Sequence, residues 1–143
     1  MQLSKETIKE IAENLDCGLI AYIHQQTKAV TYLIDVAPGE YYEMTGTDQE
    51  GQNEIENNSS DYLKIDQMSS HKAYQIMAAF TYEVSDIRIR VKLMDALEKR
   101  KPFQNFKYEV DYNEEIRQQW FKFKAKKYIE YVETELTYLD EEE

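Results

Sequence analysis

Apolar residues recur at helical spacing near the start of the chain and then give way to two short runs of β-forming residues. Ser4 is placed to cap a first helix that ends near residue 18. The apolar positions of this helix are Ile8, Ile11, Ala12 and Leu15. Residues 19–23 and 30–36 are rich in β-branched and aromatic side chains, and the polar residues 25–28 between them suit a hairpin. The pattern therefore predicts a helix followed by two antiparallel strands.

The composition changes over residues 37–61. This stretch contains Pro38, three of the four glycines of the chain and a polar run at 54–60. Such a composition is typical of a long loop, so we predict a mobile loop or insertion over 37–61 within a single domain of residues 1–143. Residues 62–65 then predict a third, short strand.

Helical periodicity dominates from residue 69 onward. Four helix starts are indicated by Ser69 or Ser70, Asp86, Pro102 and Asn113. The whole pattern predicts an α+β fold, in which an N-terminal helix and a small antiparallel sheet pack against a four-helix C-terminal half.

The helix that Asp86 caps carries apolar residues on more than one side. Its main stripe is Ile89, Leu93, Ala96 and Leu97. Ile87, Val91 and Met94 widen that stripe. Because a helix that is apolar around much of its circumference is buried on more than one side, we expect this helix to be covered on two sides.

Charge is distributed unevenly along the chain. Its 143 residues include 28 Asp and Glu against 17 Lys and Arg, for a net charge of -11. This charge repels phosphate groups and disfavours nucleic acids and anionic membranes as partners. Residues 86–127, however, hold 12 Lys and Arg against 7 Asp and Glu, which makes this segment basic by 5 charges. Such a segment either binds a partner or pairs with the acidic remainder of the same protein, and we favour the second interpretation, because charge segregation by itself does not identify a partner.

The single cysteine, Cys17, excludes an intramolecular disulfide and a metal cage of several thiolates. It stands next to an apolar run, so we expect a buried, unreactive thiol. The chain starts without the pattern of a secretory signal, and it has no apolar run of the roughly 20 residues that span a bilayer. We therefore expect a cytoplasmic protein without membrane attachment.

The common signatures of catalysis are missing from the sequence. His24 and His71 are the only histidines and lie on different predicted elements, so we predict neither a metal site nor a cofactor. Ser70 precedes His71, but successive helical residues point about 100° apart, and helix capping explains the serines better than a catalytic pair. The glycine patterns of phosphate-binding loops and of nucleophile elbows are absent. These observations disfavour an enzyme and leave catalysis at an unfamiliar site as a third hypothesis.

Two segments, 99–107 and 120–127, interleave aromatic and basic residues. Interleaved rings and cations can bind single-stranded nucleic acid, because the bases stack on the rings while the cations contact phosphates. The same spacing fits core aromatic residues flanked by solvated lysines. We favour the second interpretation and keep weak binding of single-stranded nucleic acid through 86–127 as an alternative function.

Motifs in the second half of the chain resemble a bacterial family of uncharacterised proteins. The resemblance covers about Tyr62 to Val132. It rests on the order and spacing of Ser69, Ser70, His71, Met77, Phe80, Arg88, Leu93, Ala96, Leu97, Arg100, Phe103, Phe106, Lys107, Arg117, Trp120, Phe121 and Phe123. It implies no reaction, since no activity is established for that family. The chain departs from the family pattern at Lys101 and Pro102, where members tend to have one small residue, and in the long polar stretch 37–61.

The preferred hypothesis is a non-catalytic binding or regulatory module whose partner is unknown, with another protein as one candidate. Its candidate binding residues are His71, Arg88, Arg100, Lys107 and Arg117. These cations stand beside the apolar motif residues, where a merely solvated surface would not require arginine.

Overall fold

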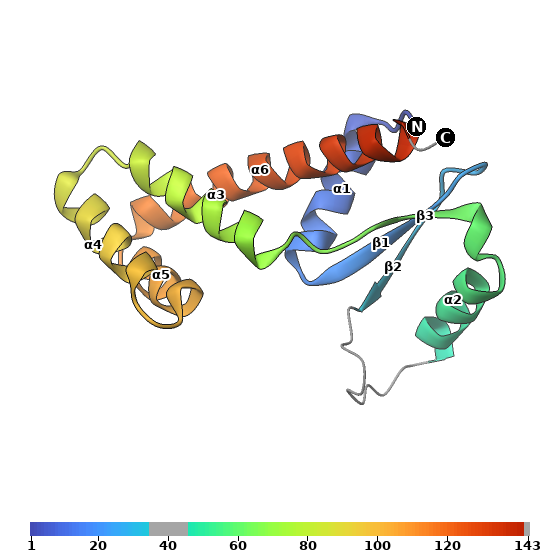
Figure 1. Cartoon of the computed structure of the whole chain (residues 1–143), viewed down its shortest axis with the longest axis horizontal. Coiled ribbons are helices and arrows are strands. Elements are labelled where there is room, and N and C mark those ends of the chain that lie inside the picture. Colours follow the sequence, from blue (N-terminus) through green and yellow to red (C-terminus); the bar gives the residue numbers. More distant parts are fainter. Residues whose placement is uncertain (35–45, 142–143) are drawn as a thin grey trace. The chain divides into compact units, whose positions relative to one another are not determined.

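The computed structural model of the protein describes residues 1–34 and 46–141 (Figure 1). They form six helices and a three-stranded antiparallel sheet within the described ranges, which confirms the predicted α+β class. The chain divides into two compact units. We call residues 1–67 with 128–143 the sheet unit, and residues 68–127 the helical unit. The prediction of a single domain over 1–143 stays a prediction.

The sheet unit contains α1, the three strands and a helix that follows the second strand. Its elements are α1 (Lys5–Asp16), β1 (Leu19–His24), β2 (Val30–Ile34), α2 (Gly46–Asn57), the 3-10 helix η1 (Ser59–Asp61) and β3 (Tyr62–Ile65). The helical unit contains α3 (Ser70–Glu83), α4 (Ile87–Glu98), α5 (Pro102–Asp111) and the first part of α6 (Glu114–Glu141). The remainder of α6 belongs to the sheet unit, so this one helix contributes residues to both units.

Side-chain caps start the helices where the sequence predicts them. The capping residues are Ser4, Ser69, Asp86 and Asn113. At α4, for example, the Asp86 carboxylate accepts hydrogen bonds from the backbone N–H groups of Arg88 (2.9 Å) and Ile89 (3.3 Å). These bonds satisfy N–H groups that have no partner within the helix.

The central strand of the sheet is β1, which pairs antiparallel with β2 on one side and with β3 on the other. Side chains alternate between the two faces of each strand. Val30 and Tyr32 of β2 pack on the core shared with α1 and the end of α6, whereas Thr31 and Leu33 approach α2. Helices therefore lie on both faces of this small sheet.

The core of the sheet unit joins α1, β1, β3 and α6. Its buried residues are Ile11, Ala12, Leu15, Ala21, Ile23, Ile65, Val132 and Leu136. Two polar side chains fix the segment after β3: Gln67 donates to the carbonyl of Leu15 (2.9 Å), and the Tyr131 hydroxyl donates to that of Asp66 (2.9 Å).

The stretch 37–61 differs from the predicted loop where the structure describes it. Residues 46–57 form α2, and 59–61 form η1; residues 37–45 lie outside the described residues. The pattern did not indicate α2 because Ile55 is its one buried apolar residue among the described side chains, so it has no apolar stripe. The helix is placed by β2 instead: a Cβ on Gly51 would lie 3.5 Å from a methyl group of Thr31.

Cys17 is exposed, so the expectation of a buried thiol was wrong. The buried residues of α1 end at Leu15. Cys17 is the C-terminal cap, and successive positions of a helix rotate by about 100°, which turns residue 17 away from the face that Leu15 buries.

Lys101 adopts a left-handed backbone conformation, with φ 57° and ψ 58°. A residue that precedes proline avoids the right-handed helical region, and the turn from α4 into α5 requires a tight reversal. Asn105 supports this turn, since its side-chain amide donates to the carbonyls of Arg100 (2.7 Å) and Lys101 (3.2 Å). The left-handed region favours glycine, so the side chain of Lys101 adds backbone strain at this turn.

Candidate functional site

The core of the helical unit contains a cluster of aromatic rings from α3, α5 and α6. The ring centroid of Phe80 lies 6.4 Å from that of Phe106 and 5.3 Å from that of Trp120. Phe106 and Trp120 are 5.0 Å apart with steeply inclined planes, a favourable edge-to-face geometry. Phe80 and Phe106 are 3% and 1% exposed. Phe106 is thus a core residue, and Trp120 packs against the same core, which supports the interpretation as core aromatics for these two rings of the interleaved segments.

Cations of α6 lie over the rings of the same helix. The guanidinium of Arg117 is 5.2 Å from the ring centroid of Phe121. The ammonium of Lys124 lies 5.4 Å from Phe121 and 5.8 Å from Trp120. Such cation–π contacts fix the cations along the helix and cover part of the ring surface that a nucleic-acid base would require.

All five candidate binding residues lie in the helical unit, four of them on four different helices and Arg100 between two of these. His71 is in the first turn of α3, Arg88 in the first turn of α4, Arg100 just after α4, Lys107 in α5 and Arg117 in the first turn of α6. Four of them are exposed, and Arg117 is partly buried. No hydrogen bond or ion pair joins any two of these five residues, all of which the structure describes, so their action as one site stays a prediction.

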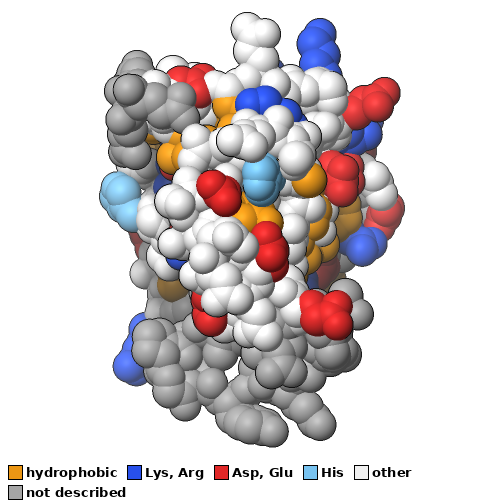
Figure 2. All heavy atoms as spheres, turned by 90° about the vertical axis from the view of Figure 1, so that its right-hand side faces the viewer, with side chains coloured by type: hydrophobic (Ala, Val, Ile, Leu, Met, Phe, Trp, Pro, Cys, Tyr) orange, Lys and Arg blue, Asp and Glu red, His pale blue; other side chains and the backbone are white. Residues whose placement is uncertain are grey.

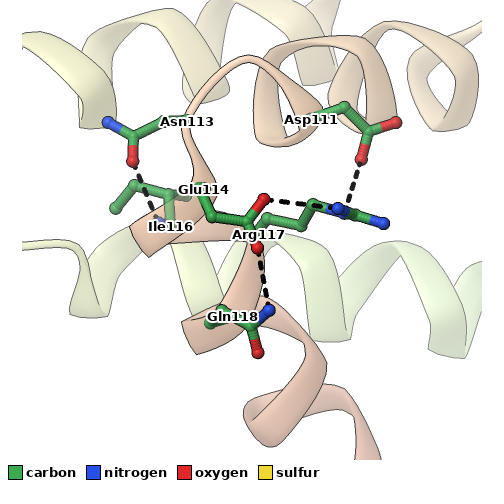
Figure 3. A network of polar contacts seen from close by, with 6 residues as sticks. All are labelled: Asp111, Asn113, Glu114, Ile116, Arg117 and Gln118. Carbon is green, nitrogen blue, oxygen red and sulfur yellow. Dashed lines mark hydrogen bonds and ion pairs between the residues drawn. The ribbon is translucent and has the colours of Figure 1, made fainter.

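Arg117 belongs to a polar network at the start of α6 (Figure 3). Its Nη1 lies 3.3 Å from a carboxylate oxygen of Glu114, and its Nε lies 3.6 Å from Asp111, beyond hydrogen-bond distance. Hydrogen bonds from Gln118, and then from Arg117, hold the pKa of Glu114 below its usual value. Arg117 is thus engaged by carboxylates of its own unit, and we regard its main role as fixing the junction of α5 and α6.

His71 and the serines before it have local partners. The Ser69 hydroxyl accepts from the backbone N–H of Lys72 (3.1 Å), as expected for a cap. One ring nitrogen of His71 lies 3.1 Å from the side-chain amide of Gln75, one turn further along α3. Helix capping therefore accounts for Ser69, and the contact with Gln75 orients the imidazole.

Arg88, Arg100 and Lys107 are the candidates whose charged groups are available. Within the described ranges, their side chains form no hydrogen bond or ion pair with other side chains, and all three are exposed. Arg90, which was not a candidate, differs: its guanidinium donates two hydrogen bonds, of 2.9 and 2.7 Å, to the carbonyl of Val84. Three free cations therefore remain from the five that the sequence indicates.

A shallow hollow of about 140 Å³ lies between α4 and the junction of α5 and α6. Its lining residues are Ile89, Lys92, Leu93, Glu109, Tyr112 and Asn113. Small-molecule sites usually measure about 300–1,000 Å³, so this hollow is small for a substrate. The sequence did not indicate it, because its lining residues follow no motif and meet only when α4 and α5 pack together.

The outer face of α4 carries exposed apolar side chains. Ile87, Val91 and Met94 are 70%, 57% and 38% exposed. The expectation that α4 is covered on two sides was therefore wrong for this chain, since the helical unit covers only the face with Leu93 and Leu97. Apolar residues in a row at helical spacing are uncommon on a surface that stays in water.

The two units have opposite charges. The helical unit holds 13 Lys and Arg against 8 Asp and Glu in the sequence, a net charge of +5, whereas the sheet unit holds 4 against 20, a net charge of -16. Figure 2, viewed from the α2 side, shows acidic side chains spread over the described surface. The basic segment 86–127 that the sequence indicates therefore lies entirely within the helical unit.

The described residues contain no group of three or more His, Cys, Asp or Glu side chains that could hold a metal ion. None of the helices in that part of the chain combines the length and the hydropathy needed to cross a membrane.

A sequence model of the family described as "Uncharacterised protein family (UPF0158)" matches residues 4–141. The chain belongs to this family. The match confirms the resemblance and extends it beyond Tyr62 to Val132, over both units of this UPF0158 member.

A relative in Pseudomonas aeruginosa, "UPF0158 protein PA5073", is 30% identical over 77 residues. The aligned segment covers 54% of this UPF0158 chain and about half the length of the relative. No solved structure matches the chain. The family description and the name of the relative state no activity.

Proposed function

We propose that this protein is a non-catalytic binding module whose helical unit binds an acidic surface of another protein. The observation that carries the proposal is the division of charge, +5 on the helical unit and -16 on the sheet unit. Within a strongly acidic chain, a compact basic unit attracts partners of opposite charge and repels basic ones, which is how electrostatic complementarity selects a partner.

Three exposed cations are the main contacts that we propose. Arg88, Arg100 and Lys107 have charged groups without side-chain partners among the residues described, so a partner carboxylate need not displace an existing ion pair. Arg117 is held by Glu114 and Asp111, and we expect it to support the surface rather than to bind.

A protein partner is favoured over single-stranded nucleic acid by the placement of the rings. Nucleic-acid binding without sequence preference requires exposed rings on which bases stack. Phe80 and Phe106 are buried, and the exposed rings of the two interleaved segments are those of Phe103 (44%) and Phe121 (39%). Arg117 and Lys124 lie over the ring of Phe121, which reduces its free surface further.

The proposal is tested by fluorescence anisotropy of the full-length protein with two labelled probes, a polyglutamate peptide and an oligothymidylate of equal length. An ionic strength near 0.15 M limits repulsion by the acidic unit to about 8 Å. We expect the polyglutamate probe to bind more tightly than the oligothymidylate. The double variant Arg100→Gln, Lys107→Gln should weaken that binding roughly tenfold, since two exposed ion pairs are lost.

A matched control is Lys5→Gln, Lys9→Gln, which removes the same charge from the sheet unit and should change the affinity less than about twofold. Arg88 stays intact in both variants because it also flanks the apolar row of α4. Tighter binding of the oligothymidylate would overturn the proposal in favour of nucleic acid. Absence of binding to either probe, or equal losses in the two double variants, would also overturn it.

A further inference from the structure

The outer face of α4 presents a row of three large apolar side chains to solvent. Ile87, Val91 and Met94 are spaced four and three residues apart, which aligns them along one side of the helix. The opposite side is buried in the helical unit, where Leu93 and Leu97 are 0% and 6% exposed. The row is therefore a second apolar face of α4, separate from the one that the fold uses.

Two opposite charges flank this row on the same side. Arg88 and Asp95 are seven residues apart, so they project in nearly the same direction, two helical turns from each other. Asp95 contacts Lys99 at 3.2 Å in an exposed pair, which contributes little stability. The other flank holds Arg90, whose guanidinium is occupied by the Val84 carbonyl.

We propose that a second copy of this chain covers the row, with the two α4 helices packed antiparallel about a two-fold axis. Val91 then packs on the partner's Met94, and Arg88 lies beside the partner's Asp95, a contact that the two-fold symmetry repeats. In an antiparallel pair, residues on the same flank of the two rows face each other. In a parallel pair, opposite flanks of the two rows would face each other, so Arg88 would lie on the side of the partner's Arg90 and away from Asp95; the flanking charges therefore favour the antiparallel arrangement.

The apolar area of the row limits the affinity that we expect for the dimer. Its three side chains expose on the order of 300 Å² of apolar surface, below the roughly 800 Å² per partner of a standard interface. The dimer should therefore be weak and should form only at high protein concentration. This inference does not depend on the proposed binding of an acidic partner, because it rests on the apolar row and its flanking charges.

Sedimentation equilibrium of the full-length protein over a range of concentrations tests the apolar contact. The wild type should show a reversible monomer–dimer equilibrium, and Val91→Glu should weaken it at least tenfold, since it buries a carboxylate in each half of the contact. Tyr82→Glu is the control, because Tyr82 is also an exposed apolar residue, at 68%, lies on α3 and should leave the equilibrium unchanged. A wild type that stays monomeric, or a dimer that persists in Val91→Glu, would overturn the proposal.

A charge swap tests the antiparallel arrangement. Arg88→Asp places two carboxylates together, Asp95→Arg places two guanidinium groups together, and each should weaken dimerisation several-fold. The double variant restores opposite charges and should return the dissociation constant to within about threefold of the wild type. Arg88→Asp places a negative charge near the N-terminus of α4, and Asp95→Arg places a positive charge near its C-terminus. Both charges interact favourably with the helix dipole, so a loss of dimer would not come from a less stable helix. A double variant as weak as the single ones would reject the second copy as the occupant of this face.

Discussion

Two glycines of the sheet unit should respond in opposite directions to the same added methyl group. Gly18 follows α1 with φ +96°, and a Cβ there would meet nothing within 4 Å. The cost of Gly18→Ala is therefore confined to the backbone, roughly 1–2 kcal/mol for a positive φ, less about 0.4–1 kcal/mol from a more restricted unfolded chain. We expect a net destabilisation of about 1 kcal/mol.

Gly51 lies within α2, where a Cβ would be 3.5 Å from Thr31 and 3.7 Å from Leu33, both ordinary van der Waals distances. Gly51→Ala should therefore stabilise the sheet unit by about 0.5–1 kcal/mol, the helix preference of alanine over glycine. Urea unfolding followed by far-ultraviolet circular dichroism, which reports on the helices of both units, compares each variant with the wild type. The midpoints should move in opposite directions at unchanged slope, and shifts of the same sign would refute the reasoning.

Three further expectations concern one backbone position and two tyrosines. Lys101→Gly removes a side chain from a left-handed backbone position and should stabilise the helical unit by about 0.5–1 kcal/mol. Lys107→Gly lies inside α5, where glycine is unfavourable, and should destabilise the unit by about 1 kcal/mol. The fluorescence of Trp120 follows the unfolding of both variants. The Tyr32 hydroxyl is buried near Asn14 without a well-formed hydrogen bond among the described residues, so Tyr32→Phe should stabilise by at most about 1 kcal/mol. Tyr131→Phe loses a 2.9 Å hydrogen bond to a main-chain carbonyl and should destabilise by a similar amount; equal effects would contradict both assignments. Burial, and then nearby carboxylates, raises the pKa of Tyr32 and of Tyr131 to about 12. The contribution of the two neutral tyrosines to the free energy of unfolding should therefore be fully present below about pH 10 and be lost between about pH 10 and 12. Urea titrations at several pH values measure this loss, which should be smaller in Tyr32→Phe.

The elements with strong local signals could be predicted from the sequence. Helix starts were predicted correctly at Ser4, Asp86 and Asn113, and to within one residue at Ser69, because a capping side chain bonds to N–H groups only two or three residues away. The strand order was not predictable, since the pairing of β1 with β3 joins residues that are far apart in the chain. The helix α2 was missed for the same reason, because its position depends on contact with β2.

For the candidate site, the sequence predicted which residues are basic but not which of them are free to bind. The sequence indicated five cations, but the engagement of Arg117 by Asp111 and Glu114 depends on how α5 meets α6. Likewise, periodicity showed that α4 is apolar on more than one side, yet it could not show that the fold covers only one of them. Periodicity reports that a side chain favours burial, and only the packed structure shows whether this chain provides the cover.

The helix α6 links the unfolding of the two units, because residues of both units belong to it. The boundary between the units falls between Lys127 and Tyr128, inside this helix, whereas boundaries between independent domains usually fall in exposed linkers. A cut or insertion there would break helical hydrogen bonds on both sides of the boundary. Amide protons near that point should therefore exchange with solvent whenever either unit unfolds, so their exchange rate follows the less stable of the two.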